Sequence, residues 1–240
     1  MPVPPAVTAV VGDGAEWSAD HEGQSGGVWK TTGAAGTFFV KHGEDAAREH
    51  DRLRWLTGRV PVPEIAAFTG DWLVLADARA VSVATEPPAD PGAAMGAILR
   101  RLHLLPVARC PFDARTPVTV GQARHNVAAG LVDADDFDDD HAGSTPGELL
   151  DRLVALCPAD EDLVVSHGDF TAENVLLRPD GSALLTDVSR LGVADRHRDI
   201  ALACRGLTGD QAGSFLAAYG LIDRPDPARL YWYRLLDEFL

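Results

Sequence analysis

The first third of the chain alternates apolar and polar positions between glycines, which is typical of short antiparallel strands. In Val28–Lys30 and Thr37–Lys41 this alternation predicts a hairpin. Glu44–Leu56 instead spaces apolar residues among charged ones with no Pro or Gly, which predicts a helix. A further strand is predicted at Asp71–Leu75. We therefore expect a β-rich region with one helix over Ala15–Leu75.

Beyond this region the apolar residues recur at three-and-four spacing, which predicts helices rather than strands. The helices are predicted at Pro91–Leu104, Thr119–Val132, Pro146–Leu156, Ile200–Leu207, Gln211–Tyr219 and Asp226–Phe239. The segment Ala78–Asp90 is predicted to be a connector, because it contains a pair of prolines. We therefore expect an α+β fold class with two lobes, a small β-rich one at residues 1–77 and a larger, mainly helical one at residues 78–240.

The composition is hydrophobic enough for a core and strongly acidic. The chain has 240 residues, 46% of them hydrophobic, and a formal net charge of −15. A negative surface disfavours nucleic acid as a partner, because phosphate binding usually needs a basic face, and it favours a cationic partner. An acidic excess can also serve only to keep a protein soluble, so composition alone leaves both interpretations open.

The apolar runs are too short to cross a membrane. The longest, such as Leu73–Ala76, fall far below the roughly 18 to 20 residues that a span needs. The N-terminal segment has three prolines and no Lys or Arg before its apolar residues, unlike a secretory signal, so we expect a cytoplasmic protein that does not associate with membranes. The cysteines, Cys110, Cys157 and Cys204, are too few and too widely spaced for a disulfide framework or a zinc site.

An acidic run, Asp133–Asp140, separates two of the predicted helices. It contains six carboxylates in eight residues, which is too much charge for a packed core. We predict that it forms a solvated loop. Such a loop is one candidate surface for a cationic partner.

The segment Leu163–Asp169 has the pattern of a kinase catalytic loop, an apolar strand that runs into a Gly turn and an acid. Asn174 follows five residues after Asp169. In kinases an Asp at the first position orients the attacking hydroxyl, and an Asn five residues later holds Mg²⁺. His167 is interpreted as a structural residue that anchors the loop through hydrogen bonds.

A second metal ligand is predicted directly after the catalytic loop. Val175–Leu177 and Ala183–Leu185 form a predicted hairpin, and Asp187 stands just past its second strand. Mg²⁺ prefers oxygen ligands and usually keeps waters while it bridges substrate phosphates. One Asn and one Asp on a rigid hairpin, Asn174 and Asp187, are therefore enough for a magnesium site.

A kinase also needs a cation on the transferred phosphates, and Lys41 at the end of a predicted strand is the candidate. Glu49 follows on the next helix and can pair with it, as a strand lysine pairs with a helix glutamate in protein kinases. Phe39 shares the face of Lys41 and is predicted to lie against an adenine ring, with core packing as its competing role. The Gly23–Gly27 turn, with Ser25 at its centre, could bring backbone N–H groups to the phosphates.

Taken together, the residues resemble the aminoglycoside 3'-phosphotransferases over nearly the whole chain. The segments that carry the resemblance are Gly130–Asp136, Leu163–Asp169, Arg190–Arg196, Asp199–Ala203 and Tyr233–Leu240. The resemblance implies a protein-kinase-like two-lobed fold that uses ATP, or GTP, with Mg²⁺ to phosphorylate a hydroxyl of antibiotics such as kanamycin and neomycin. We expect a monomer or a weak dimer.

The resemblance also assigns roles to individual residues. Asp169 becomes the catalytic aspartate, Asn174 and Asp187 the metal ligands, and Lys41 with Glu49 the phosphate clamp. It implies an adenine site between Phe39 and the connector, where backbone groups of Ala76 and Ala78 meet the base. The residues that it assigns to the antibiotic are Asp136, Asp138, Asp139, Asp237, Glu238 and the Leu240 carboxylate, with Arg190 and Arg205 organising the carboxylates or forming structural ion pairs.

A polycationic aminoglycoside suits a site lined by carboxylates, which gives the acidic run a purpose. Three other interpretations stay open at this point. The acceptor could be another hydroxylated metabolite or antibiotic, the chain could be a catalytically silent kinase-like binding module, or the acidic surface could recruit a basic protein. The chain also departs from the family pattern at Ser189, where a Gly is usual, and at Leu240, where a Phe is frequent.

Overall fold

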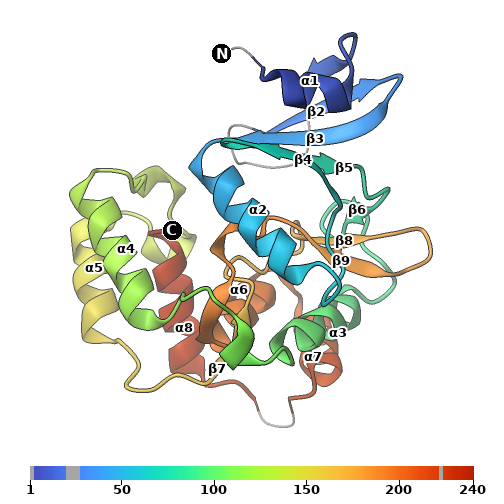
Figure 1. Ribbon diagram of the computed structural model, residues 1–240. Coiled ribbons are helices and arrows are strands. Elements are labelled where there is room, and N and C mark those ends of the chain that lie inside the picture. Colours follow the sequence, from blue (N-terminus) through green and yellow to red (C-terminus); the bar gives the residue numbers. More distant parts are fainter. Residues whose placement is uncertain (1–2, 20–27, 222–223) are drawn as a thin grey trace. The chain divides into compact units, whose positions relative to one another are not determined.

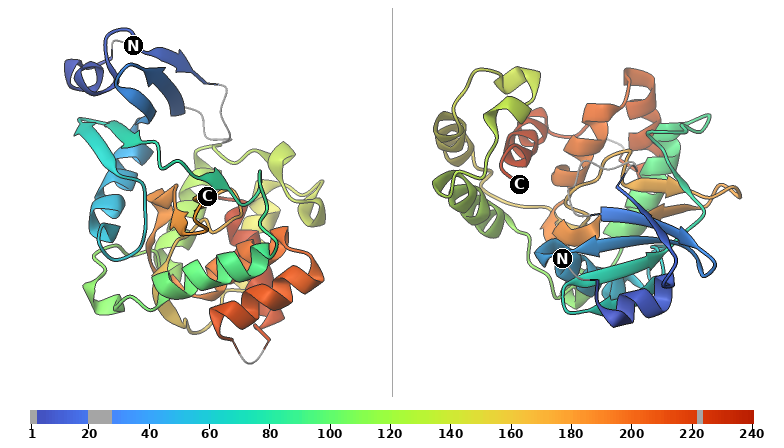
Figure 2. Two further views of the ribbon diagram at one scale, coloured as in Figure 1. Left: turned by 90° about the vertical axis from the view of Figure 1, so that its right-hand side faces the viewer. Right: turned by 90° about the horizontal axis from the view of Figure 1, so that it is seen from above.

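The computed structural model describes residues 3–19, 28–221 and 224–240, which form two compact units (Figures 1 and 2). The first unit contains the described residues of Met1–Ala89 together with Ala172–Arg190. The second contains Asp90–Thr171 and those of Leu191–Leu240. The predicted catalytic loop therefore contributes residues to both units.

The first unit contains an antiparallel sheet of five strands in the order β1-β2-β3-β5-β4. Its elements are α1 (Pro5–Val11), β1 (Glu16–Ser18), β2 (Val28–Gly33), β3 (Gly36–His42), α2 (Glu44–Leu56), β4 (Ile65–Thr69) and β5 (Trp72–Ala76). Val40 and Val74 on one face of the sheet pack with Val7 and Val11 of α1. Because side chains alternate along a strand, Lys41 points to the opposite face.

The rest of the first unit is a three-stranded sheet in the order β6-β8-β9, followed by a short turn of 3₁₀-helix. These elements are β6 (Val81–Ser82), β8 (Val175–Leu177), β9 (Ala183–Leu185) and η4 (Val188–Arg190). The helix α2 packs against η4, so residues of α2 lie beside the segment that follows β9.

The second unit is mainly helical, with one two-stranded antiparallel ladder between β7 and β10. Its elements are α3 (Pro91–His103), η1 (Val107–Arg109), α4 (Thr116–Ala128), η2 (Ala134–Asp136), η3 (Asp139–His141), α5 (Pro146–Ala155), β7 (Leu163–Ser166), β10 (Gly192–Asp195), α6 (His197–Gly206), α7 (Gly209–Tyr219) and α8 (Pro227–Asp237).

Two helices of this unit, α3 and α7, lie side by side at close range (Figure 1). Gly92 and Gly96 of α3 face the backbone of α7, and a Cβ at Gly96 would collide with the Phe215 carbonyl oxygen. The glycines are therefore required for the close approach of the two helices. A second core lies around α8, where Trp232 packs with Leu149 and other residues of α4, α5 and α6.

The observed elements confirm the two-lobed α+β fold class and the predicted hairpin, the helix at Glu44–Leu56 and the mainly helical second part. The helix predicted at Thr119–Val132 instead spans Thr116–Ala128, because Pro117 starts it early and Gly130, with a φ of 68°, follows its end. The acidic run is largely exposed, as predicted for a solvated loop, and it contains η2 and part of η3.

Among the residues that the structure describes, no helix is long and apolar enough to cross a membrane.

Candidate active site

Three charged side chains meet in the first unit, although they lie far apart in the sequence. Lys41 on β3 donates to Glu49 on α2, with 2.7 Å between Nζ and Oε2, and also pairs with Asp187, which follows β9. The Lys41 and Glu49 side chains are only 11% and 3% exposed, whereas Asp187 is 42% exposed. The ammonium is thus held by a buried carboxylate on one side and a half-exposed one on the other.

Both carboxylates of this cluster stabilise the positive charge of Lys41. Burial by itself lowers the pKa of Lys41, but the attraction of Glu49 and Asp187 outweighs it and raises that pKa above its usual range. Burial raises the pKa of Glu49, and Lys41 opposes this shift. The lysine therefore stays a cation, as a group that holds phosphates must.

The hairpin of β8 and β9 brings Asn174 and Asp187 to the same end. The two strands pair from Val175 with Leu185, and beyond them the Thr186 N–H donates to the Asn174 carbonyl at 3.1 Å. Asn174 is buried, and Asp187 has a φ of 52°, in the left-handed region that Asp tolerates better than most residues. An amide oxygen and a carboxylate oxygen at one hairpin end are donors of the type that Mg²⁺ prefers.

Asp169 lies in the second unit, just beyond β7, and is half-buried. Its backbone N–H donates to Nδ1 of His167 at 3.3 Å, so His167 contacts the loop backbone as its predicted structural role requires. His167 itself is fully buried. These contacts hold the backbone on which Asp169 stands.

A buried carboxylate, Asp199 at the start of α6, anchors this loop. Its Oδ1 accepts from the Ser166 hydroxyl at 3.0 Å and the Gly168 N–H at 2.8 Å. Its Oδ2 accepts from the His167 N–H at 2.8 Å and lies 2.8 Å from His103 Nε2. Each oxygen thus serves one backbone N–H of the loop and one side chain.

Hydrogen bonding outweighs burial at Asp199. Burial would raise the pKa of this fully buried carboxyl, but the bonds from His103 and the loop N–H groups lower it. His103 is held in turn by the Tyr219 hydroxyl, 2.7 Å from its Nδ1. Sequence reasoning assigned Asp199 no role, although an acid directly before the apolar run Ile200–Ala203 is the available signal for a buried anchor.

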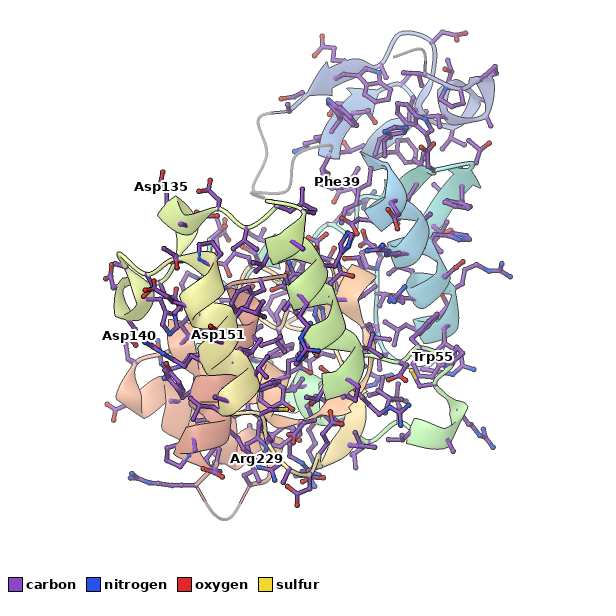
Figure 3. The ribbon with its side chains drawn as sticks, turned by 90° about the vertical axis from the view of Figure 1, so that its left-hand side faces the viewer. Phe39, Trp55, Asp135, Asp140, Asp151 and Arg229 are labelled. Carbon is purple, nitrogen blue, oxygen red and sulfur yellow. The ribbon has the colours of Figure 1, made fainter. Side chains whose placement is uncertain are left out.

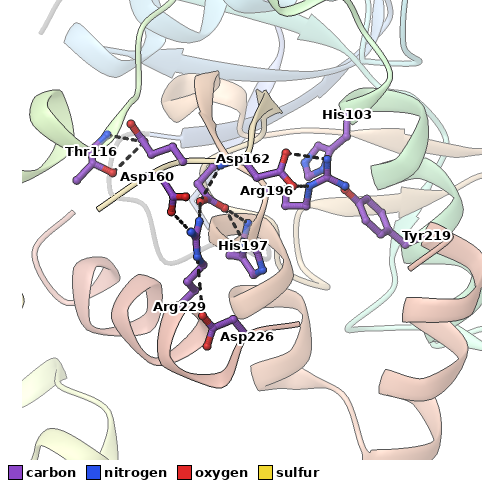
Figure 4. A network of polar contacts seen from close by, with 11 residues as sticks. His103, Thr116, Asp160, Asp162, Arg196, His197, Tyr219, Asp226 and Arg229 are labelled. Atoms are coloured by element: carbon purple, nitrogen blue, oxygen red, sulfur yellow. Dashed lines mark hydrogen bonds and ion pairs between the residues drawn. The ribbon is translucent and has the colours of Figure 1, made fainter. Parts of the chain in front are cut away.

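A second buried carboxylate, Asp195, stands at the opposite end of the β7–β10 ladder. Its partners Asp162, His197 and Arg229 are labelled in Figure 4. It accepts from the His197 N–H at 2.8 Å, the Asp162 N–H at 3.1 Å and Arg229 at 2.6 Å. His197 Nδ1 lies 2.7 Å from it. Asp195 therefore fastens the start of β7, as Asp199 fastens its end.

The acidic loop, defined here as Asp133–His141, is joined to the C-terminal residues. Arg205 of α6 bridges Asp138 of the loop and Asp237 of α8, at 3.2 Å to each. Glu238 contacts His141 at 2.5 Å and accepts from the Asp138 N–H. The structure thus brings together Asp138, Asp237 and Glu238, three of the residues that the resemblance assigns to the antibiotic, with Arg205 between two of them.

The remaining predicted residues lie as follows. Asp136 and Asp139 are exposed on the acidic loop, and Leu240 packs partly on the core around α8. Phe39, labelled in Figure 3, is half-buried and shares the face of Lys41. The Ala76 N–H donates to the Glu64 carbonyl at 2.9 Å, and Ala78 lies just past β5. Arg190 is the last residue of η4, in the first unit. Ser25 lies outside the described residues.

The chain is similar to known phosphotransferases along nearly all of its length. Residues 16–233 match the phosphotransferase enzyme family. An aminoglycoside 3'-phosphotransferase of Streptomyces fradiae is 42% identical over 93% of this chain and 95% of that protein.

Two solved structures are also similar. An aminoglycoside-3'-phosphotransferase of type VIII has a TM-score of 0.88 at 36% identity, with 98% of both chains covered. The aminoglycoside phosphotransferase APH(3'')-Id from Streptomyces rimosus, in complex with ADP and streptomycin, has a TM-score of 0.80 at 26% identity and covers 98% of this chain and 96% of that one.

Proposed function

The chain belongs to the phosphotransferase enzyme family, and on that premise we propose that it transfers the γ-phosphate of ATP to the 3'-hydroxyl of an aminoglycoside. The observation that carries this proposal is the buried cluster of Lys41, Glu49 and Asp187, beside a hairpin end that offers Asn174. The presence of Lys41, Asp169, Asn174 and Asp187 together speaks against a catalytically silent binding module. Catalysis here is mainly a matter of positioning and charge stabilisation.

Lys41 is proposed to hold the phosphates of the nucleotide. Glu49 fixes its ammonium from the buried side, and the half-exposed side toward Asp187 is where phosphate oxygens can reach it. Phe39 lies on the same face and offers its ring to the adenine. The Ala76 carbonyl and the Ala78 N–H, which the resemblance assigns to the adenine site, are proposed as the acceptor and donor for the base.

Asn174 and Asp187 are proposed to hold Mg²⁺, since both are oxygen donors at one end of a rigid hairpin. Bound there, the ion would neutralise phosphate charge during transfer. Asp187 also pairs with Lys41, so the same carboxylate would contact both the lysine and the metal ion. GTP in place of ATP is compatible with the same contacts, because they involve the phosphates.

Asp169 is proposed to accept or orient the proton of the acceptor hydroxyl. The backbone on which it stands is fixed by His167 and, through Asp199, by the start of α6. A fixed carboxylate can align the hydroxyl for in-line attack without reorganisation at the moment of reaction. Asp169 is thus the residue whose loss should stop transfer while leaving substrate binding in place.

The acceptor is proposed to bind through its ammonium groups. Asp136 and Asp139 are exposed on the acidic loop, and Asp138 and Asp237 stand around Arg205. Each exposed pair contributes only about 0.2–1 kcal/mol, so affinity must come from several pairs acting together. A net charge of −15 adds long-range attraction for a polycation and disfavours nucleic acid. We also propose a cytoplasmic monomer or weak dimer, since ATP is a cytoplasmic substrate.

An ATP-coupled assay over a panel of aminoglycosides tests the proposal. The panel pairs compounds that carry a 3'-hydroxyl, such as kanamycin and neomycin, with their 3'-deoxy analogues. We expect turnover of the former and none of the latter. Turnover of both members of a pair would overturn the 3' assignment, and ATP turnover only with an unrelated hydroxylated metabolite would overturn the acceptor class.

A further inference from the structure

Glu238 is nearly closed to solvent, although it lies two residues from the C-terminal Leu240. Its side chain is 6% exposed, and its Oε1 lies 2.5 Å from Nδ1 of His141. The Asp138 N–H donates to the same carboxylate, at 3.2 Å from Oε1 and 3.4 Å from Oε2. The carboxylate is therefore already engaged by two donors from the acidic loop.

His141 is the buried partner in this pair. Its side chain is 3% exposed, and its ring packs edge-on against Tyr231 of α8, with 5.9 Å between the ring centroids. Within the described part of the chain, its Nε2 has no hydrogen-bond partner. The contact with Glu238 is thus the polar interaction that fixes the orientation of the imidazole.

The His141–Glu238 pair differs in strength from the other link between the loop and the C-terminal helices. Arg205 and Asp138 are 35% and 37% exposed, so solvent and salt weaken their attraction. His141 and Glu238 are shielded from both, which makes their hydrogen bond the firmer attachment. Breaking it would leave a buried carboxylate without its closest donor.

The carboxylates that face solvent lie on the same short loop as His141. Asp135 and Asp140 are labelled on the loop in Figure 3, and Asp136 and Asp139 lie between them in sequence. Six carboxylates in eight residues repel each other, so the loop is unfavourable in this compact form unless something holds it. The buried pair supplies that restraint.

We propose that His141 is a positioning residue for acceptor binding. By holding Glu238 it fixes the acidic loop on α8, so that the exposed carboxylates are arranged for a polycation before one binds. The same contact holds Glu238 itself in place among the carboxylates that the resemblance assigns to the antibiotic. The inference rests on the proposed function, because it takes an aminoglycoside as the acceptor. Preorganised charges avoid the ordering cost that a loose loop would incur on binding.

The experiment compares three variants with the wild-type enzyme. His141→Leu removes the hydrogen-bond donor and fills its space with an apolar side chain. His141→Asn keeps an amide N–H near the position of Nδ1. Asp151→Asn removes one exposed carboxylate from α5, outside the acidic loop in sequence, as a matched control for charge.

Steady-state kinetics with neomycin and kanamycin provides the first readout. We expect His141→Leu to raise the acceptor KM about tenfold, a factor that corresponds to about 1.4 kcal/mol. The acceptor with more amino groups should be affected more, while the KM for ATP stays within twofold. His141→Asn should recover most of the loss, and Asp151→Asn should behave as wild type.

Hydrogen exchange by mass spectrometry provides a second readout that needs no activity. We expect faster exchange over residues 133–141 in His141→Leu and unchanged exchange in β7. An unchanged acceptor KM in an active His141→Leu enzyme would overturn the positioning role, and so would unchanged exchange in the loop. If the wild-type enzyme phosphorylates no aminoglycoside, the proposed function fails first, a result that these variants cannot mimic.

Discussion

The substitution Asp199→Asn tests how strongly one buried carboxylate holds the catalytic loop. In Asp199→Asn one carboxylate oxygen becomes an NH₂ group that cannot accept a hydrogen bond. Oδ1 serves the Gly168 N–H and the Ser166 hydroxyl, and Oδ2 serves the His167 N–H and His103. Whichever way the amide is oriented, one backbone N–H of the catalytic loop therefore loses its acceptor.

The cost follows from these contacts. A buried N–H without a partner costs about 1–3 kcal/mol, and loss of the charge weakens the remaining bonds by about 1 kcal/mol more. We expect the free energy of unfolding to fall by about 3 kcal/mol. The loop that carries Asp169 should also shift, and a misplacement of about 1 Å costs on the order of 100-fold in rate.

Urea unfolding and kcat per folded molecule are the two measurements. Asp195→Asn is the matched control, because Asp195 is equally buried and also serves four donors, but at the far end of the β7–β10 ladder. It should lose similar stability and keep kcat. The reasoning is refuted if Asp199→Asn loses under about 1 kcal/mol, or if both variants lose kcat alike.

The remaining predictions concern the phosphate clamp, helix packing and acid stability. Lys41→Met should raise the KM for ATP at least about tenfold, because a charge-assisted contact of about 1.5–3 kcal/mol is lost and Glu49 is left without its cation. An unchanged KM for ATP would contradict this. Gly96→Ala should lower the free energy of unfolding by about 1–3 kcal/mol, because the new Cβ meets the Phe215 carbonyl; an unaltered thermal midpoint would argue against close packing of α3 and α7. The pKa of Asp199 is lower in the folded state than in the unfolded state. Its contribution to stability is therefore complete above the unfolded pKa of about 4 and is lost as the pH falls through the folded-state pKa. The free energy of unfolding measured below about pH 4 should depend less on pH in Asp199→Asn than in the wild type.

The elements that could be predicted from the sequence are those with a strong local pattern. The β2–β3 hairpin and α2 follow from alternation and from three-and-four spacing, and both occur where they were expected. The short elements α1, β1, β4 and β10 were missed, because three to seven residues carry too little periodicity. Their existence depends on neighbours that are distant in the sequence.

In the candidate site, too, some features follow from local sequence patterns and others depend on residues that are distant in the sequence. Spacing predicts roles for Asp169 and Asn174, and these stay predictions. The structure brings Lys41, Glu49 and Asp187 into contact. The anchoring role of Asp199 had only one local signal, its place before the apolar run Ile200–Ala203, and its partners depend on tertiary contacts. The burial of Glu238 against His141 could not be predicted, because no local pattern encodes that contact.

The central claim is that Asp169 positions the acceptor hydroxyl for transfer, and a single-turnover measurement tests it most directly. Asp169→Asn is compared with Glu173→Gln, which alters an exposed acid of the same loop. Transfer from ATP to kanamycin should fall by about 10²–10⁴-fold in Asp169→Asn, the usual contribution of an acid–base group, and should persist in Glu173→Gln. Kanamycin and ATP binding, measured by calorimetry, should be retained in both. Transfer at the wild-type rate in Asp169→Asn would contradict the account.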